Sequence, residues 1–262
     1  MHHDAFLSLA AQGFLRAGSV DLADRTLDLV ADKTHIASCL LGYSREFWRK
    51  EERAEALESL EEAYAILESQ HERETRDSRA RFRLLTQIAA QFAGFEKGER
   101  AIEIAELIKD ESERTSALTQ IAAILTIREQ DEQARQAFRA ITDDGDRTFA
   151  LIGMSDAKEK NGERDAAIQL LDEAAALAES VPQLTFRASA YNEIGRRLMS
   201  YGQAIEAGRA LQNSLDAITE VRDTSSQAIS LAALAEIAGE GEFEPDESFL
   251  ATLRALAARA GV

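Results

Sequence analysis

The sequence contains one cysteine, two prolines and a single tryptophan. A lone cysteine, Cys39, excludes an intrachain disulfide, and its apolar surroundings predict a small buried residue. Few prolines, little valine and frequent alanine favour helix over sheet. No apolar run is long enough to form a transmembrane helix. The opening residues, MHHDAF, do not have the pattern of a signal peptide, so we expect a cytoplasmic protein.

Sequence motifs for catalysis are also missing. The chain has no nucleophile elbow, phosphate loop or dinucleotide-binding fingerprint. Its four histidines are not spaced with other ligands as metal sites require. His2 and His3 could hold Cu(II) beside a free N-terminus, although a chance pair is the favoured interpretation. We therefore predict a non-enzymatic protein with no cofactor and no metal.

The formal net charge of −17 excludes several classes of partner. Nucleic-acid binding normally requires a basic face, and anionic membranes repel an acidic protein. A basic protein partner would be attracted. Surface carboxylates also keep proteins soluble without any binding role, and this is the favoured interpretation of the charge.

What the sequence does contain is a repeat. A short apolar pattern recurs seven times, and successive anchor residues are separated by 32, 47, 33, 33, 40 and 40 positions. The anchors are Leu9, Leu41, Ile88, Ile121, Met154, Ile194 and Leu234. This period, built from helical patterns, predicts a stacked helical solenoid. We attribute the longer spacings to longer helices, including a charged one over 51–80 whose part beyond Glu68 should be a solvated extension or loop. We also expect a final helix over 246–260.

Two positions of the repeat are small. The residue after each anchor is Ala10, Gly42, Ala89, Ala122, Ser155, Gly195 or Ala235. A second helix follows, with alanine at Ala23, Ala54, Ala101, Ala134, Ala167 and Ala207. Small residues at such positions predict that the two helices cross closely there. Glycine between them, at Gly18, Gly162 and Gly202, suits a left-handed turn that ends the first helix.

The junctions between repeats pair an aspartate with an arginine four residues later. The pairs are Asp77–Arg81, Asp110–Arg114 and Asp143–Arg147. We predict that each aspartate caps a helix and that the arginine pairs with it; an arginine ladder for an acidic ligand is the alternative. Trp48 is predicted to pack in the core, with an exposed binding hot spot as its alternative.

This unit resembles a degenerate tetratricopeptide repeat (TPR), on the helix-turn-helix length, the small residue after the anchor and the alanine of the second helix. A HEAT-like solenoid is the alternative. The resemblance implies an all-α, right-handed solenoid of about seven antiparallel repeats, forming one domain over 1–262. The approximate repeats are 4–32, 34–70, 78–109, 112–141, 145–180, 183–220 and 224–260.

The resemblance also implies that the first helices line a concave groove that binds a protein or peptide segment. The implied groove residues are Tyr43, Glu46, Thr86, Ala90, Thr119, Ala123, Thr126, Phe149, Asp156, Glu159, Asn192 and Arg196. Those in the middle are small and nearly neutral. An acidic lip at Asp156 and Glu159 favours a partly basic segment, with a merely solvated face as the alternative.

The expected function is thus a protein-interaction scaffold. One alternative is a structural protein that self-assembles, because repeats of neighbouring chains could stack end to end and the first repeat has no obvious polar cap. Another is a helical accessory domain of a larger enzyme.

Overall fold

The structure is a computed structural model that describes residues 2–69, 78–240 and 245–260. These residues form fourteen α-helices and no strand. They divide into two compact units, residues 1–133 (unit 1) and 134–262 (unit 2), each described by itself below. The prediction of one continuous domain stays a prediction.

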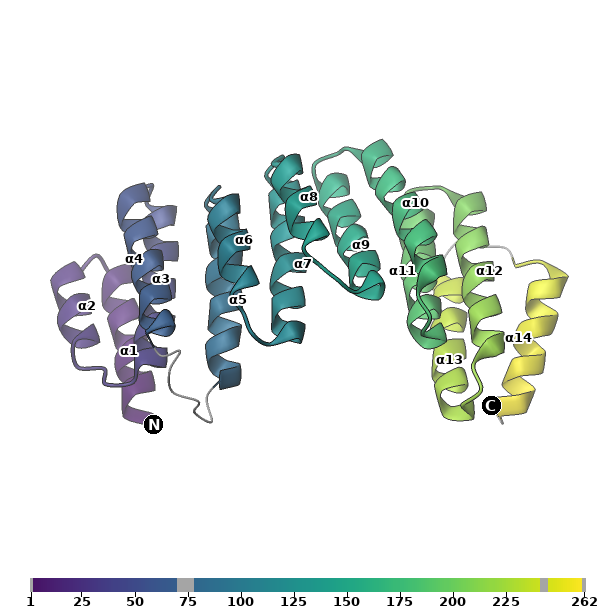
Figure 1. Cartoon of the computed structure of the whole chain (residues 1–262), viewed down its shortest axis with the longest axis horizontal. Coiled ribbons are helices and arrows are strands. Elements are labelled where there is room, and N and C mark those ends of the chain that lie inside the picture. Colours follow the sequence, from purple (N-terminus) through teal and green to yellow (C-terminus); the bar gives the residue numbers. More distant parts are fainter. Residues whose placement is uncertain (1, 70–77, 241–244, 261–262) are drawn as a thin grey trace. The chain divides into compact units, whose positions relative to one another are not determined.

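Unit 1 contains seven helices and the first turn of an eighth. They are α1 (His2–Arg16), α2 (Val20–Leu27), α3 (Lys33–Arg49), α4 (Arg53–Glu68), α5 (Ser78–Gly94), α6 (Gly98–Glu106) and α7 (Glu111–Ile127), followed by the start of α8 (Asp131–Arg139). Consecutive helices pack as antiparallel hairpins, α1 with α2, α3 with α4 and α5 with α6 (Figure 1). The first helices of the hairpins also pack side by side, in the order α1, α3, α5 and α7.

Unit 2 holds the rest of α8 and six further helices. They are α9 (Asp144–Lys160), α10 (Arg164–Ser180), α11 (Leu184–Ser200), α12 (Ala204–Glu220), α13 (Thr224–Glu240) and α14 (Glu247–Ala260). The hairpins here are α9 with α10, α11 with α12 and α13 with α14. We call the odd-numbered helices A helices and the even-numbered ones B helices. The predicted final helix over 246–260 is confirmed as α14.

Six A helices end in the same turn. Two residues beyond the helix, one residue adopts a positive φ between 59° and 81°. These turn residues are Gly18, Glu51, Glu96, Glu129, Gly162 and Gly202. In each turn two N–H groups bond back to carbonyls of the helix, as in a Schellman motif; for example, Gly162 donates to Glu159 and Glu163 donates to Lys158, both at 2.9 Å. The predicted left-handed glycines are confirmed, and three glutamates replace glycine elsewhere.

Counting from the turn residues corrects the register of the first two repeats. The residue seven positions before the turn is small and buried in all six: Ala11, Ser44, Ala89, Ala122, Ser155 and Gly195. Ala10 and Gly42 were therefore one and two residues out of register, and the anchor Leu9 is 64% exposed. Ala235, predicted as the seventh member, is exposed.

The alanine of the B helix lies five residues after the turn. It is Ala23, Ala56, Ala101, Ala134, Ala167 or Ala207, and none has exposed surface. Ala54 was two residues out of register and is exposed. The close crossing is measurable at Gly195, where an added Cβ would lie 2.8 Å from Leu211 Cδ2 and 3.5 Å from the Ala207 carbonyl oxygen.

B-helix length explains the longer spacings. The helices α6 and α8 have nine residues each, whereas α10 and α12 have 17. The prediction of longer helices is confirmed there. In unit 1, α4 covers Arg53–Glu68, so the helical part of the predicted 51–80 segment is confirmed and ends at the residue beyond which an extension or loop was expected. Residues 70–77, including Asp77 and His71, lie outside the described residues.

The junctions keep the predicted caps but not the predicted ion pairs. Asp110 accepts from the Glu113 N–H at 2.9 Å, as a helix cap does. Arg114 does not pair with it and instead donates to the Ile108 carbonyl at the end of the preceding chain segment. Arg187 donates in the same way to the Val181 carbonyl, at 2.9 and 2.7 Å. These arginines satisfy carbonyls that a helix end leaves unpaired.

The third junction also keeps its cap. Asp143 accepts from the Asp146 N–H at 3.0 Å. Arg147 pairs with Asp144, at 3.2 Å, rather than with Asp143. The arginine-to-aspartate pairing at four-residue spacing was therefore wrong at both junctions that the structure describes.

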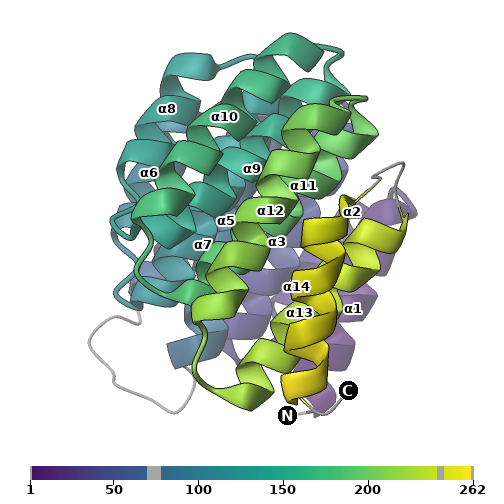
Figure 2. The same cartoon turned by 90° about the vertical axis from the view of Figure 1, so that its right-hand side faces the viewer.

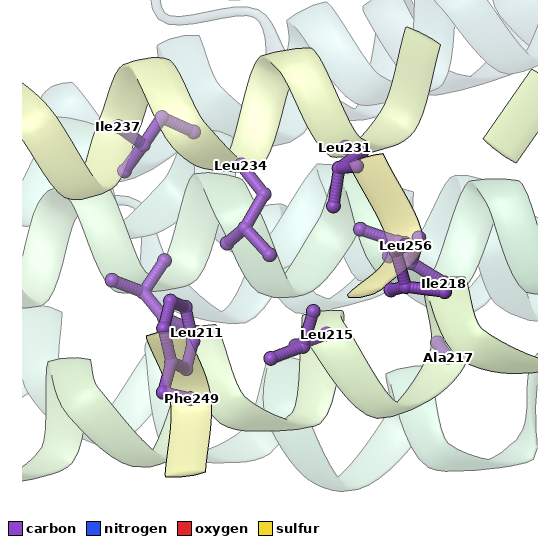
Figure 3. Close-up of a cluster of buried hydrophobic side chains, with 10 residues drawn as sticks. Leu211, Leu215, Ala217, Ile218, Leu231, Leu234, Ile237, Phe249 and Leu256 are labelled. Carbon is purple, nitrogen blue, oxygen red and sulfur yellow. The ribbon is translucent and has the colours of Figure 1, made fainter. Parts of the chain in front are cut away.

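The C-terminal hairpin closes over an apolar cluster (Figure 3). Leu211, Leu215 and Ile218 of α12 meet Leu231, Leu234 and Ile237 of α13, and α14 adds Phe249 and Leu256. All are at most 5% exposed. Figure 2 shows α14 beside α12 and α13, and α14 contacts both. Steps of three, four or seven residues along each helix put one face into this core.

Candidate interaction surface on the A helices

Four predicted groove residues are buried between helices. They are Tyr43, Thr86, Thr126 and Asn192, each at most 5% exposed. Thr86 lies ten positions before its turn residue, where side chains face the next A helix, and its hydroxyl donates to the Glu113 carbonyl at 3.4 Å. The Thr126 hydroxyl donates to Ala122 of its own helix at 2.8 Å. These side chains are not available to a ligand.

Tyr43 and Glu46 were chosen from the misplaced anchor in the second repeat. In the corrected register, the equivalent positions are Arg45 and Trp48. Tyr43 is buried, and burial raises the pKa of its phenol above the ordinary value. Glu46 is half-buried and pairs with Arg49 at 2.8 Å.

The open A-helix surface of unit 1 is rich in arginine. Ala90 and Ala123, both half-buried, lie at its centre beside Thr119. Exposed arginines flank them. They are Arg45 and Arg49 on α3, and Arg79 and Arg83 on α5. We call these seven residues the arginine surface. Since short side chains leave room for a backbone and guanidinium groups bind carboxylates, the surface suits an extended acidic segment.

The arginines are only partly neutralised. Arg45 donates to the amide oxygen of Gln91 at 2.7 Å, which leaves its charge without a carboxylate partner. Arg83 lies 3.8 Å from Glu113, and both partners keep exposed surface. Such exposed pairs contribute little in water. The surface therefore keeps positive charge in a chain whose net charge is −17.

Trp48 is held on both faces. Its ring stacks on Phe95 with centroids 3.9 Å apart and planes 7° apart. The guanidinium of Arg53 covers the other face at 3.7 Å. This supports the predicted packing role over the binding hot spot, because neither face of the ring is open.

The acidic lip predicted in unit 2 is neutralised by arginine. Both oxygens of Asp156 accept from Arg197, at 2.7 and 2.8 Å. Arg197 also donates to Glu193 at 2.6 Å, and Glu193 lies 3.2 Å from Arg196. Burial lowers the pKa of Arg197, but the hydrogen bonds to Asp156 and Glu193 outweigh it, so the pKa is raised above its ordinary value.

The other predicted groove residues of unit 2 also have partners within the chain. Glu159 accepts from Arg164 at 2.6 Å, which lowers the pKa of the carboxyl. Phe149 packs edge-on against Phe186, with centroids 5.0 Å apart. Of the twelve predicted residues, the structure thus leaves Ala90, Thr119 and Ala123 together on an open surface in unit 1.

Two hollows occupy the same place between successive B helices, and sequence analysis missed both. In unit 1, a hollow of about 260 Å³ lies among Tyr64, Glu68, Arg81 and Leu107. In unit 2, one of about 380 Å³ lies among Glu179, Arg187, Tyr191 and Asp216. Arg81 and Arg187 both lie fifteen residues before a turn residue, and both donate to the carbonyl of a helix end. Each arginine also lies seven residues before a predicted anchor, Ile88 or Ile194, so this shared position could have been found from the sequence.

The described residues add neither a metal site nor a membrane-spanning helix. The described residues include no group of three or more His, Cys, Asp or Glu side chains placed to hold a metal ion. None of the described helices is both long and apolar enough to cross a membrane. Cys39 is fully buried, as predicted, and burial raises the pKa of its thiol.

No protein-family model and no curated protein matches the chain. Solved structures similar to it include the TPR-like repeats of a kinesin light chain from Podosopora anserina, 18% identical, with a TM-score of 0.37 over 87% of this chain and 98% of that one. The nuclear import adaptor Nro1 of S. pombe is 13% identical, with a TM-score of 0.35 over 96% and 97%.

A third similar structure is an ATPase of the STAND class with a tetratricopeptide repeat sensor, from Pyrococcus horikoshii. It is 11% identical, with a TM-score of 0.39 over 97% of this chain and 41% of that one. These likenesses are weak, and the repeat is visible in the chain's own hairpins, turns and small residues. The chain has a TPR-like helical repeat fold.

Proposed function

We propose that the chain is a non-enzymatic scaffold that binds a protein segment along the arginine surface of unit 1. The observation that carries this is the combination of small residues, Ala90 and Ala123, with exposed arginines that have few carboxylate partners. An extended acidic segment is the occupant that best matches this chemistry, because arginine forms paired hydrogen bonds with carboxylates.

A basic segment, which the acidic lip would favour, receives less support. In unit 2 the ligand would have to displace Arg197 from Asp156 and Arg164 from Glu159. Breaking such pairs offsets the gain from forming new ones. On the arginine surface, Arg49 pairs with Glu46 at 2.8 Å and Arg83 lies 3.8 Å from Glu113, but among the described residues the only partner of Arg45 is a neutral amide.

The test is affinity capture from source lysate with the full chain as bait. Ala90→Glu with Ala123→Glu blocks the surface, and Arg45→Glu with Arg83→Glu reverses its charge. Ala65→Glu, at an exposed alanine of α4, is the matched control. Bound proteins are eluted in parallel with a glutamate-rich and a lysine-rich peptide and identified by mass spectrometry.

We expect a partner that both the unmodified chain and Ala65→Glu retain, that both double variants lose, and that the glutamate-rich peptide releases. Circular dichroism confirms that every bait is folded. Equal capture by all baits would contradict binding on the arginine surface. Release by the lysine-rich peptide alone would contradict an acidic segment, and the absence of any partner would contradict the scaffold.

A further inference from the structure

Large exposed apolar side chains gather at the first hairpin. The described residues include ten of them, and six lie between residues 6 and 29. The six are Phe6, Leu9, Phe14, Val20, Leu22 and Leu29. Phe6 and Leu9 are 69% and 64% exposed. Exposed apolar residues that are grouped in one element mark an interaction site more often than isolated ones do.

The repeat shows what these positions do elsewhere. Phe6 lies twelve residues before its turn residue. The equivalents in other A helices are buried against the preceding A helix: Cys39, Leu84, Ala117 and Ala190. The Cys39 thiol, for example, donates to the Ser8 carbonyl of α1 at 3.5 Å. Phe6 therefore occupies a position built for contact with an A helix that precedes α1.

Leu9 and Leu22 belong to the same face. The equivalent of Leu9 in α3 is Gly42, where an added Cβ would lie 2.8 Å from the Gln12 side chain of α1. The equivalent of Leu22 in α6 is Arg100, which pairs with Glu61 on the preceding B helix at 2.9 Å. We call Phe6, Leu9 and Leu22 the N-terminal face.

The last A helix presents the complementary surface. Gln227 of α13 donates to the Val221 carbonyl at 3.1 Å, just as Arg187 of α11 donates to Val181, and this aligns the two helices 40 residues apart. Asn192 of α11 is 4% exposed and faces the next A helix. Its equivalent, Ala232, is exposed, as is Ala235 one turn on. We call Ala232 and Ala235 the C-terminal face.

We propose that the N-terminal face of one copy of this chain packs on the C-terminal face of another, continuing the A-helix stack from molecule to molecule. The two faces match in size, because large side chains on one meet alanines on the other. They also correspond by position, because interior A helices use the equivalent surfaces to pack on the neighbouring A helix. Head-to-tail contacts of this type leave one N-terminal face and one C-terminal face open on each assembly, so the assembly lengthens with concentration.

The experiment measures the mass of the full chain by light scattering and sedimentation, from micromolar to hundreds of micromolar concentration. Phe6→Glu blocks one face and Ala232→Arg blocks the other. Ile205→Glu, at an exposed apolar residue of α12 outside both faces, is the matched control. Circular dichroism confirms that each variant is helical.

We expect the mass of the unmodified chain and of Ile205→Glu to rise with concentration, and each end variant alone to remain a monomer. An equal mixture of Phe6→Glu and Ala232→Arg should form a dimer and nothing larger, because each variant keeps one intact face. A monomeric unmodified chain at every concentration would overturn the proposal.

Other occupants give different results. Contact between two N-terminal faces predicts a dimer that Ala232→Arg retains and Phe6→Glu loses, with no new species on mixing, and it would overturn head-to-tail stacking. Capture of a partner on the arginine surface is measured separately on the monomeric variants. Failure of that binding therefore leaves the self-association result unaffected.

Discussion

Units 1 and 2 use the same turn but differ in how often glycine closes it. Three of the four turns of unit 1 place glutamate in the left-handed conformation, at Glu51, Glu96 and Glu129, and only the first has glycine, Gly18, whereas both turns of unit 2 place glycine there, at Gly162 and Gly202. Glutamate in this conformation costs roughly 1 kcal/mol relative to glycine. The turn forms in either case, so packing of the hairpin and not the turn residue sets the geometry.

The same contrast recurs where successive A helices meet. Five residues before the turn, α5 carries Gln91 and α11 carries Arg197. Gln91 bonds to Ser44 and to Arg45 of α3, and Arg197 binds Asp156 of α9. One unit joins its A helices through an amide and the other through an ion pair. The contact lies at the same position of the repeat in both units, but different side chains make it.

The largest expected effect falls on the close crossing of α11 and α12. Gly195→Leu places a side chain where a Cβ alone would lie 2.8 Å from Leu211. We expect a loss of about 3 kcal/mol in the free energy of unfolding, measured by urea denaturation followed by circular dichroism. Gly94→Leu in unit 1 is the control, because a Cβ on Gly94 has no neighbour within 4 Å. Equal loss in both variants would show that the crossing is not responsible, because helix propensity alone favours leucine over glycine.

Trp48 allows the response of unit 1 to be followed separately. It is the only tryptophan in the chain, and it stacks on Phe95 within unit 1. In Gly195→Leu, we expect circular dichroism to detect an earlier transition than tryptophan fluorescence does. Coincident transitions would mean that the two units unfold together.

The second prediction concerns the contact between successive A helices at Arg197 and Gln91. Arg197→Ala leaves Asp156 without its arginine in a partly buried setting, while Glu193 keeps Arg196, and we expect a loss of about 2 kcal/mol. Gln91→Ala removes neutral hydrogen bonds, and we expect about 1 kcal/mol. Thermal unfolding at low and high salt separates the two, since only the ion pair should weaken with salt. A salt-independent Arg197→Ala effect would indicate lost packing of the arginine stem instead.

Sequence periodicity predicted the helices well and their register unevenly. The period, the small residues and the alanines identified the hairpins from Ala89 onward without error up to Gly195. In the first two repeats, apolar strings such as AFLSLAA match the pattern at more than one offset, so Ala10 and Gly42 were chosen as the small residues in place of Ala11 and Ser44. The turn glutamates could not reveal the register, because glutamate carries no preference for the left-handed conformation.

The candidate surface was harder to predict than the fold. Burial at Thr86 and Asn192 depends on how closely the next A helix approaches, which the sequence of one helix does not contain. The partners of Asp156 and Glu159 lie 41 and five residues away along the chain. Charge composition alone suggested an acidic surface, whereas the positions of Arg45 and Arg83 on neighbouring A helices produce a basic one within an acidic protein.

The third prediction exchanges the turn residues between the units. Glu51→Gly, Glu96→Gly and Glu129→Gly should each stabilise the chain by up to about 1 kcal/mol, because glycine adopts the left-handed turn without steric cost. Gly162→Ala should lower stability by about 1 kcal/mol. Tryptophan fluorescence should register the first set. No gain from the glutamate replacements would mean that glycine's greater freedom in the unfolded chain cancels the relief of strain.

The smallest effect concerns pH. Asp223 caps α13 by accepting from the Ser226 N–H at 2.7 Å, and the hydrogen bonds from Ser226 lower its pKa. A lowered folded-state pKa stabilises the chain above the unfolded pKa of about 3.9, and this contribution is lost as pH falls through the lower folded-state value. Asp223→Asn keeps an acceptor at the cap but cannot titrate.

In unit 1, burial raises the pKa of Asp32, yet hydrogen bonds from His35 lower it by more. Asp32→Asn is therefore the matching variant. In urea titrations at a series of pH values, the stability advantage of the unmodified chain over either variant should shrink as pH falls below about 4. An advantage that stays constant to lower pH would mean that the cap stabilises its helix equally well in the protonated form, and that the two units lose stability in acid through other carboxylates.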